Sequence, residues 1–194
     1  MSWLTGDPAA DELLDRDPFA LLIGMLLDQQ VTMESAFAGP AKILSRLGSV
    51  TPEAIAQADP EAFIELCRTP PAVHRYPGSM AGRVQAVAAA VVKDYDGDVT
   101  RLWLEGEPDG AEVRRRPEAL PGFGAQKAQI FVALLGKQRG VTPTGWREAA
   151  GSYGDEGSRS SIADVTDEQS LLEVRATKQA AKAAAKAAKA AKSG

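Results

Sequence analysis

The chain has 194 residues, of which 44% are hydrophobic and 25% are charged, with one histidine and one cysteine. The single cysteine, Cys67, excludes an intrachain disulfide framework and any zinc or iron–sulfur site built from four cysteines. No apolar run approaches the roughly 20 residues of a membrane-spanning helix, and the start of the chain is acidic rather than basic. We therefore expect a cytoplasmic protein without a metal or another cofactor.

The formal net charge of −4 hides an asymmetry between the body and the C-terminal tail. Residues 178–194 hold five of the 22 basic side chains and none of the 26 acidic ones, which leaves the rest of the chain at −9. A body this acidic does not favour binding of nucleic acid over its whole surface. Any binding of phosphate must therefore be local or come from the tail.

The tail itself repeats alanine, with lysine at spacings of three and four. Both residues favour helix, but the tail has no apolar face larger than methyl groups. We expect a disordered or nascent-helical arm over residues 178–194. Such an arm either meets phosphate or serves only as a solubilising end.

Upstream of the tail, apolar residues recur at helical spacing, and no convincing strand pattern occurs. The segment from Pro18 to Leu27 is apolar nearly all round and predicts a buried central helix, with Asp17 as its N-cap. Further helices are expected over residues 33–47, after Pro52 and Pro60, over 79–95 and near 99–104. The sequence thus predicts an all-α fold.

The most informative stretch begins with the turn Leu120–Gly124, which contains Gly122 and Gly124. Apolar residues at helical spacing follow it up to Leu135. The glycines permit a close approach of the backbone, and the first amides of the following helix lack partners within the helix. A phosphate can bind there without any basic side chain. An ordinary tight turn between two helices explains the same pattern.

With Lys127 and Ala128, this turn resembles the helix-hairpin-helix of the HhH-GPD superfamily of base-excision DNA glycosylases, which includes endonuclease III. A second segment, residues 18–32, resembles the opening core helix of that superfamily, with a glutamine pair at its end. The run of about six helices expected between the two segments suits the six-helix module of the superfamily. Together the segments span residues 18–136.

The resemblance implies a two-lobed helical fold, with a six-helix module over residues 18–136 and a second lobe from residues 1–17 and 137–177. It also implies a protein that holds duplex DNA by the hairpin and accepts an extruded, damaged or mismatched base in a cleft, since a glycosidic bond cannot be reached inside the duplex. By the same resemblance, Gly122, Gly124, Ala125, Gln126 and Lys127 would bind DNA, and Gln29, Gln30 and Trp146 would line the base pocket. The two glutamines can equally end their helix at the surface.

The chain departs from the superfamily at the catalytic positions. Where bifunctional members have a lysine that attacks the sugar, this chain has Gln126, whose amide cannot form a Schiff base, and Lys127 points about 100° away around the helix. The aspartate that active members carry about two dozen residues after the motif leucine is absent from residues 142–148. Glu148, Asp155 and Asp164 are the candidate replacements, although each also suits a surface or capping role.

Other residues give weaker signals. The triplet Arg114–Arg116 directly precedes the hairpin and suits either a phosphate contact or a solvated face. His74 has no cysteine or second histidine beside it, so we expect a loop or surface histidine rather than a metal ligand. Cys67 lies in an apolar pattern and predicts a small buried side chain.

Three functions remain open at this point. The first is a monofunctional DNA glycosylase that hydrolyses the N-glycosidic bond of a damaged or mismatched base. The second is a non-catalytic relative that binds damaged duplex DNA, since the usual aspartate and lysine are missing. The third is a helical interaction protein that does not bind nucleic acid. For the first two we expect a monomer that binds double-stranded DNA and, in a bacterium, associates with the nucleoid.

Overall fold

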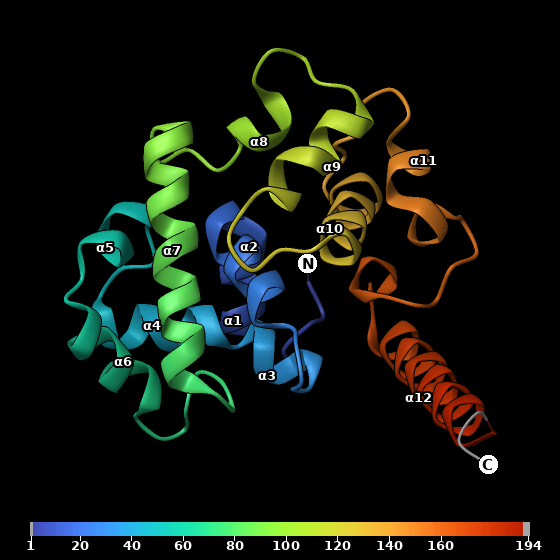
Figure 1. Cartoon of the computed structure of the whole chain (residues 1–194), viewed down its shortest axis with the longest axis horizontal. Coiled ribbons are helices and arrows are strands. Elements are labelled where there is room, and N and C mark those ends of the chain that lie inside the picture. The colour runs from blue at the N-terminus through green and yellow to red at the C-terminus, as the bar shows by residue number, and fades with distance from the viewer. Residues whose placement is uncertain (1, 192–194) are drawn as a thin grey trace.

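The computed structural model describes residues 2–191, and within these residues it contains helices and no strands, which confirms the all-α fold class (Figure 1). The helices are α1 (Pro8–Arg16), α2 (Pro18–Leu27), α3 (Met33–Phe37), α4 (Gly39–Leu47), α5 (Pro52–Gln57), α6 (Pro60–Arg68), α7 (Pro77–Tyr95), α8 (Arg101–Leu104), α9 (Gly110–Glu118), α10 (Ala125–Gln138), α11 (Trp146–Ala150) and α12 (Glu168–Ala191), with the 3-10 helices η1 (Gly151–Gly154) and η2 (Ile162–Asp164). None of the described helices is both long enough and apolar enough to cross a membrane.

Helix α2 is the centre of the core, as its composition predicts. Asp17 caps it through hydrogen bonds from the amides of Phe19 (2.9 Å) and Ala20 (3.0 Å). Every residue from Phe19 to Leu27 is buried. Gly24 allows α3 to approach closely, because a Cβ at Gly24 would lie 2.5 Å from a ring carbon of Phe37. The apolar surface of α2 is thus covered on most sides and ends at Asp28.

The helix expected over residues 33–47 is divided in the structure. Helix α3 ends at Phe37, and α4 begins at Gly39, with Pro40 in its first turn. Proline has no amide hydrogen to donate to a preceding turn, so it begins a helix more readily than it continues one. The division gives α3 and α4 separate contacts with α2.

The helices pack in two groups (Figure 1). In the first group, α1, α3 and α4 pack against α2, and α5 and α6 pack against α7. In the second group, α9, α11, η1 and η2 surround α10. Contacts between α2 and α10 join the groups. This grouping differs from the division expected from the sequence, because α1 lies with α2 and α4, whereas α9 and α10 lie with the helices that follow them.

The arm over residues 178–194, expected to be disordered or nascent-helical, is helical over most of its length, because α12 continues without a break to Ala191. The start of α12 is anchored: Asp167 accepts a hydrogen bond from the Ser170 amide (2.7 Å), and Val174 is fully buried. Once a helix is nucleated, each further alanine or lysine extends it at little cost. Residues 192–194 lie outside the described part of the chain.

Candidate nucleic-acid interface

The hairpin lies between α9 and α10, as predicted. Its turn closes through a hydrogen bond from the Phe123 amide to the Leu120 carbonyl (3.1 Å), and Gly122 adopts a φ of +78°. Gly124 is the N-cap of α10 and has no side chain to cap it, and the first bond of the helix runs from the Ala128 amide to the Gly124 carbonyl (3.0 Å). The amides of residues 125–127 precede that bond and point outward from the helix end. Such an end binds anions.

The hairpin is seated on the C-terminal end of α2. A Cβ at Gly122 would lie 3.0 Å from Cδ1 of Leu26. Lys127 crosses the same contact, since its Nζ donates to the carbonyls of Met25 (2.9 Å) and Leu26 (2.5 Å). Burial lowers the pKa of Lys127 to about 8, although nearby Asp28 opposes the shift. The Lys127 side chain therefore joins α10 to α2, and only its backbone amide is left to face a phosphate.

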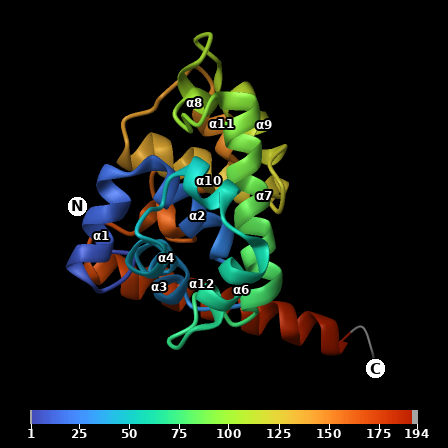
Figure 2. The same ribbon diagram turned by 90° about the vertical axis from the view of Figure 1, so that its left-hand side faces the viewer.

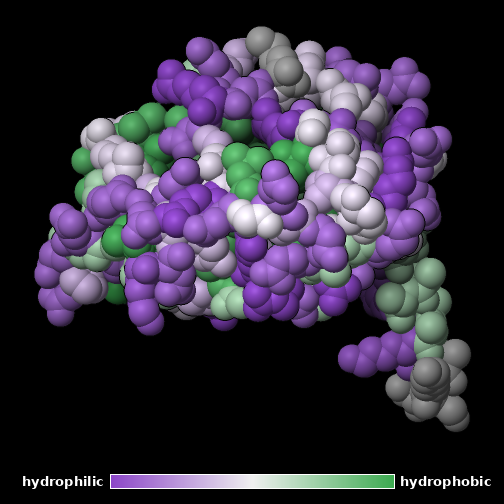
Figure 3. Space-filling model, turned by 90° about the horizontal axis from the view of Figure 1, so that it is seen from above, coloured by the Kyte–Doolittle hydropathy of each residue, from purple (hydrophilic) through white to green (hydrophobic). Residues whose placement is uncertain are grey.

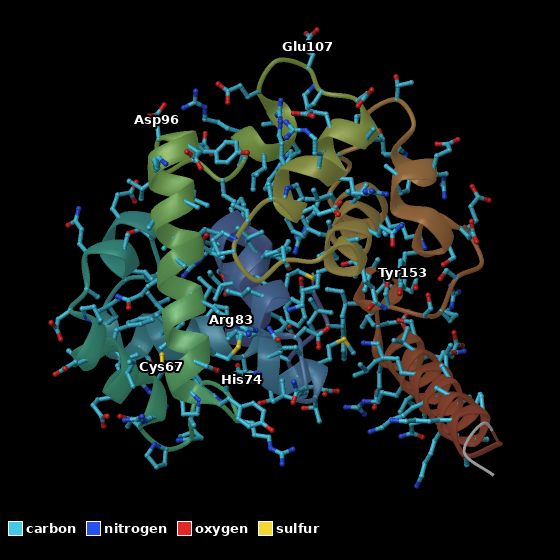
Figure 4. All side chains as sticks on the ribbon, in the orientation of Figure 1. Cys67, His74, Arg83, Asp96, Glu107 and Tyr153 are labelled. Carbon is cyan, nitrogen blue, oxygen red and sulfur yellow. The ribbon has the colours of Figure 1, made fainter. Side chains whose placement is uncertain are left out.

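The loop after α2 is held by α7 and by the segment before it (Figure 4). Arg83 donates to the side-chain oxygen of Gln29 (3.0 Å). Nε2 of His74 donates to the Gln29 carbonyl (2.9 Å), because its Nδ1 accepts a hydrogen bond from the Tyr76 amide (3.0 Å). His74 lies in the loop between α6 and α7, as the sequence predicts, but it is buried there with both ring nitrogens hydrogen-bonded and is not at the surface.

Gln30 follows in the left-handed region, with a φ of +58°. That conformation costs about 1–2 kcal/mol for a residue other than glycine, and the Gln30 side chain is exposed. The strained residue stands directly at the junction of the two groups of helices.

A cavity of about 500 Å³ opens at this junction, next to the hairpin. One side is formed by the end of α2 and the start of α10, and the other by η1, the segment before η2 and α12. Its lining residues are Met25, Asp28, Gln29, Gln30, Gln126, Lys127, Ile130, Tyr153, Ser160, Thr177, Lys178 and Ala181. The structure thus brings Gln29 and Gln30 together with Gln126 and Lys127.

Asp28 is the carboxylate of this cavity. It is partly buried, and its side chain makes no hydrogen bond or ion pair within residues 2–191. Burial raises the pKa of Asp28, and the positive charges of Lys178 and Lys127 oppose the rise. Across the cavity, the side-chain amide of Gln126 donates to the Tyr153 hydroxyl (2.8 Å). The site therefore combines an unpaired carboxylate with hydrogen-bonding side chains beside the hairpin.

Asp164, a candidate carboxylate from the sequence, is structural instead. Its side chain is 1% exposed and forms an ion pair with Lys137 (2.6 Å). The second carboxylate oxygen accepts the amides of Ser160 (3.0 Å) and Ser161 (3.2 Å). With both oxygens occupied, Asp164 holds η2 against α10.

The other two candidate carboxylates also lie away from the cavity. Glu148 is exposed and lines a different surface hollow with Asp109 and Thr144. Asp155 is exposed, and the contact that anchors it is its backbone carbonyl, which accepts from Lys137 (2.8 Å). Neither carboxylate lines the cavity beside the hairpin.

Trp146 was expected in the base pocket, and the structure corrects this. Its indole packs against the C-terminal half of α10, where a Cβ at Gly136 would lie 2.4 Å from the ring. Arg147 covers the ring, with its guanidinium carbon 4.5 Å from the ring centroid. Because Gly136 leaves room on α10, the indole fills that space and does not line the cavity.

Each arginine of the triplet Arg114–Arg116 is paired with a neighbouring acid. Glu112 forms ion pairs with Arg115 (2.7 Å) and Arg116 (2.9 Å), and Glu118 pairs with Arg114 (3.4 Å). Two arginines hold the pKa of Glu112 down at about 2. The triplet therefore stabilises α9 and the end of α8, and the sequence signal for a phosphate contact has a structural explanation.

Sequence reasoning placed four of the twelve lining residues at the site and missed the other eight, among them Asp28, Tyr153 and Lys178. Asp28 stands directly before the glutamine pair, and the end of the apolar run at a carboxylate was a signal that could have identified it. Within the described part of the chain, no cluster of three or more histidine, cysteine or acidic side chains could hold a metal ion. Cys67 is buried, as its pattern predicts.

A sequence model of the family described as "HhH-GPD superfamily base excision DNA repair protein" matches residues 23–192. The chain belongs to this superfamily. Neither a curated protein nor a solved structure matches the chain in sequence. As an HhH-GPD member, it is a base excision DNA repair protein that binds DNA, and the hairpin and the cavity are the parts of the fold where that binding is expected.

Proposed function

We propose that this protein is a monofunctional DNA glycosylase that hydrolyses the N-glycosidic bond of a damaged or mismatched base in duplex DNA. The observation that carries the proposal is the position of Asp28. It is a partly buried, unpaired carboxylate in a cavity of about 500 Å³ that opens beside the hairpin amides. Cavities of this size hold small organic ligands, and a nucleoside falls within that class.

In the proposed reaction, the amides at the start of α10 hold a backbone phosphate, and the target nucleotide rotates out of the stack into the cavity. Asp28 stabilises the positive charge that develops on the sugar as the bond to the base weakens. The bond to the base breaks with its electron pair going to the base, and a water molecule adds to the sugar carbon. The proton that the water loses passes to the Asp28 carboxylate and from there, through solvent, to the departing base, which restores the carboxylate. The products are a free base and an abasic site.

We infer that no lyase step follows. Gln126 has no amine, and the Lys127 amine donates to two carbonyls at the end of α2. A Schiff base at Lys127 would require these hydrogen bonds to be broken and the hairpin to separate from α2. In a Lys178→Gln variant, which removes the other amine that lines the cavity, borohydride added during the reaction should therefore trap no covalent complex between protein and DNA.

The test is a base-release assay on duplexes that contain uracil, hypoxanthine, alkylated purines, oxidised bases or mismatches. With the lesion that is released, Asp28→Asn should lower the single-turnover rate roughly 10²–10⁴-fold, the range of contributions from a positioned acid or base. Asp155→Asn and Glu148→Gln are the matched controls, since both are exposed and outside the cavity. Unchanged release by Asp28→Asn would reject the role of Asp28.

The alternative is a non-catalytic relative that recognises damaged duplex DNA. One observation favours it: the carboxylate of the cavity comes from the end of α2, whereas active members carry theirs after the hairpin. Selective binding of damaged duplexes, without release of any base in the panel, would establish this alternative.

A further inference from the structure

The last part of α12 projects from the body of the protein (Figures 1 and 2). Every described side chain from Arg175 to position 190 is exposed. After Glu173 the chain contains no acidic residue, although the body as a whole carries an excess of acid. The projecting helix is thus the one long cationic segment of an acidic protein.

The basic residues of α12 lie on one face. Arg175, Lys178, Lys182, Lys186 and Lys189 follow one another at spacings of three or four residues. At about 100° per residue, all five fall within an arc of about 80°, and the stripe extends along about 20 Å of the helix axis. We call these five residues the lysine stripe.

The start of the lysine stripe faces the hairpin side of the molecule. Lys178 lines the cavity that contains Asp28 and Lys127. Arg175, Lys178 and Lys182 line an adjoining hollow of about 510 Å³, which shares Asp28 with the first cavity. The two hollows therefore adjoin each other beside α12, and together we call them the groove.

An ion pair fixes the rotation of α12 about its axis. Arg175, the first residue of the lysine stripe, pairs with Glu34 on α3. Because α12 is one continuous helix, this contact orients Lys178 and Lys182 toward the groove, and it orients the later lysines on the same face beyond the body.

The lysines and alanines of α12 favour binding to a polyanion. Beyond Val174 the faces without lysine consist almost entirely of alanine, which offers no large apolar side chain for insertion into a membrane. In Figure 3 the projecting part of α12 is a pale green, weakly hydrophobic surface with a purple, hydrophilic side chain beside it. A duplex carries one negative charge per about 1.7 Å of axis, so a rigid cationic stripe can meet several phosphates at once.

We propose that the lysine stripe binds backbone phosphates of the same duplex whose lesion enters the cavity. It supplies affinity that does not depend on sequence or lesion, and it compensates for the acidic body. The inference rests on the proposed function only in that both sites serve one DNA molecule. It does not require base release, because the binding step alone involves the stripe.

The test measures the dissociation constant of the full chain for undamaged duplex DNA at several salt concentrations. Lys182→Gln combined with Lys186→Gln should reduce the slope of log K against log salt by about 2, since each phosphate contact contributes about 0.9. At about 0.1 M salt, affinity should fall on the order of tenfold. An unchanged slope and affinity would overturn the proposal.

A matched control keeps every charge but moves the lysine stripe. Insertion of one alanine between Ala180 and Ala181 turns all later lysines by about 100° around the helix. If the stripe acts as a rigid face, this insertion should weaken binding nearly as much as the double substitution, with the helix signal in circular dichroism unchanged. Wild-type binding by the insertion variant would overturn the stripe in favour of an unoriented charged tail.

Two further outcomes separate this inference from the proposed function. If the double substitution reduces the slope of log K against log salt and the wild-type protein releases no base, the lysine stripe is supported and the glycosylase is rejected. Base release with an unchanged salt slope does the reverse. Binding of the stripe to vesicles of anionic lipid, with no contribution to DNA affinity, would also overturn the proposal.

Discussion

A lysine and a carboxylate lie at each end of α10, but the carboxylate is paired at one end and unpaired at the other. At the C-terminal end, Lys137 is bonded to the buried carboxylate of Asp164, which also accepts two backbone amides. At the N-terminal end, Lys127 is bonded to two carbonyls of α2, and Asp28 nearby has no hydrogen bond or ion pair within the described residues. One carboxylate has all its oxygens occupied, and the other has free acceptors that face a cavity.

This difference separates a structural charge from an available one. A buried pair with satisfied hydrogen bonds resists any change, because removing one partner leaves the other charged and desolvated. An unpaired carboxylate beside a cavity can interact with a ligand at no cost in internal bonds. Sequence alone ranked Asp164 among the candidate carboxylates and omitted Asp28, since the two states differ only in the folded protein.

The largest effect on stability is expected at the C-terminal end of α10, where the carboxylate is fully paired. Lys137→Met leaves Asp164 buried without its cation, so the free energy of unfolding should fall by about 3–5 kcal/mol. Urea unfolding followed by circular dichroism measures this. A loss below about 1 kcal/mol would show that Asp164 is stabilised by its two amides alone and would weaken the contrast between the ends.

The second prediction concerns pH and Lys127. Its pKa is about 8 in the folded protein, against the ordinary lysine pKa of 10.5 in the unfolded chain, so between these values the unfolded chain binds more protons than the folded one. Stability from this group is therefore fully present above pH 10.5 and is lost as the pH falls through 8. Measured against Lys127→Met, the wild type should gain roughly 2–3 kcal/mol between pH 8 and 10.5.

The comparison with Lys127→Met removes the contributions of other groups that titrate at alkaline pH, such as Cys67, whose pKa burial raises to about 11. Urea midpoints at half-unit steps of pH give the difference directly. A difference that does not vary with pH would mean that Lys127 is not desolvated at the contact between α10 and α2.

The third prediction tests whether stability and DNA binding at the N-terminal end of α10 depend on the conformation of the hairpin. Gly122→Ala places a side chain at a φ of +78° and 3.0 Å from Leu26, which should cost about 1–2 kcal/mol and weaken DNA binding. Gly124→Ala is the matched control for stability, because its φ is negative and nothing lies within 4 Å of the new Cβ. Thermal unfolding of both variants, with DNA titration of Gly122→Ala, decides the point, and equal losses of stability would contradict it.

The sequence predicted those parts of the fold that depend on local signals. The apolar run of α2 with Asp17 before it, and the glycines of the hairpin, each determine a backbone conformation within a few residues. The cavity could not be predicted in this way, because it brings Asp28 together with Tyr153 and Lys178, which lie more than a hundred residues away along the chain.

The placement of Trp146 and the conformation of the tail have the same origin. Trp146 was assigned to the pocket from its position after the hairpin, yet the space left by Gly136 determines where the indole packs. The tail lacks an apolar face, yet α12 forms because its beginning is anchored by Val174 and by the pair of Arg175 with Glu34. In both cases a tertiary contact decided what the local pattern left open.

The smallest effect is expected for the arginines before the hairpin, because their charges are already paired with acids. Arg115 is exposed and paired with Glu112, so Arg115→Gln should leave the urea midpoint of unfolding nearly unchanged. Because its charge is already compensated and Arg116 remains on Glu112, DNA affinity should change less than twofold and the slope of log K against log salt should not change.

Parallel salt titrations with the double variant Lys182→Gln, Lys186→Gln provide the comparison, since the two lysines replaced there have no acidic neighbour on α12. A loss of slope for Arg115→Gln as large as that of the double variant would mean that DNA displaces Glu112 from the triplet. The distinction between paired and available charge would then fail at the hairpin itself.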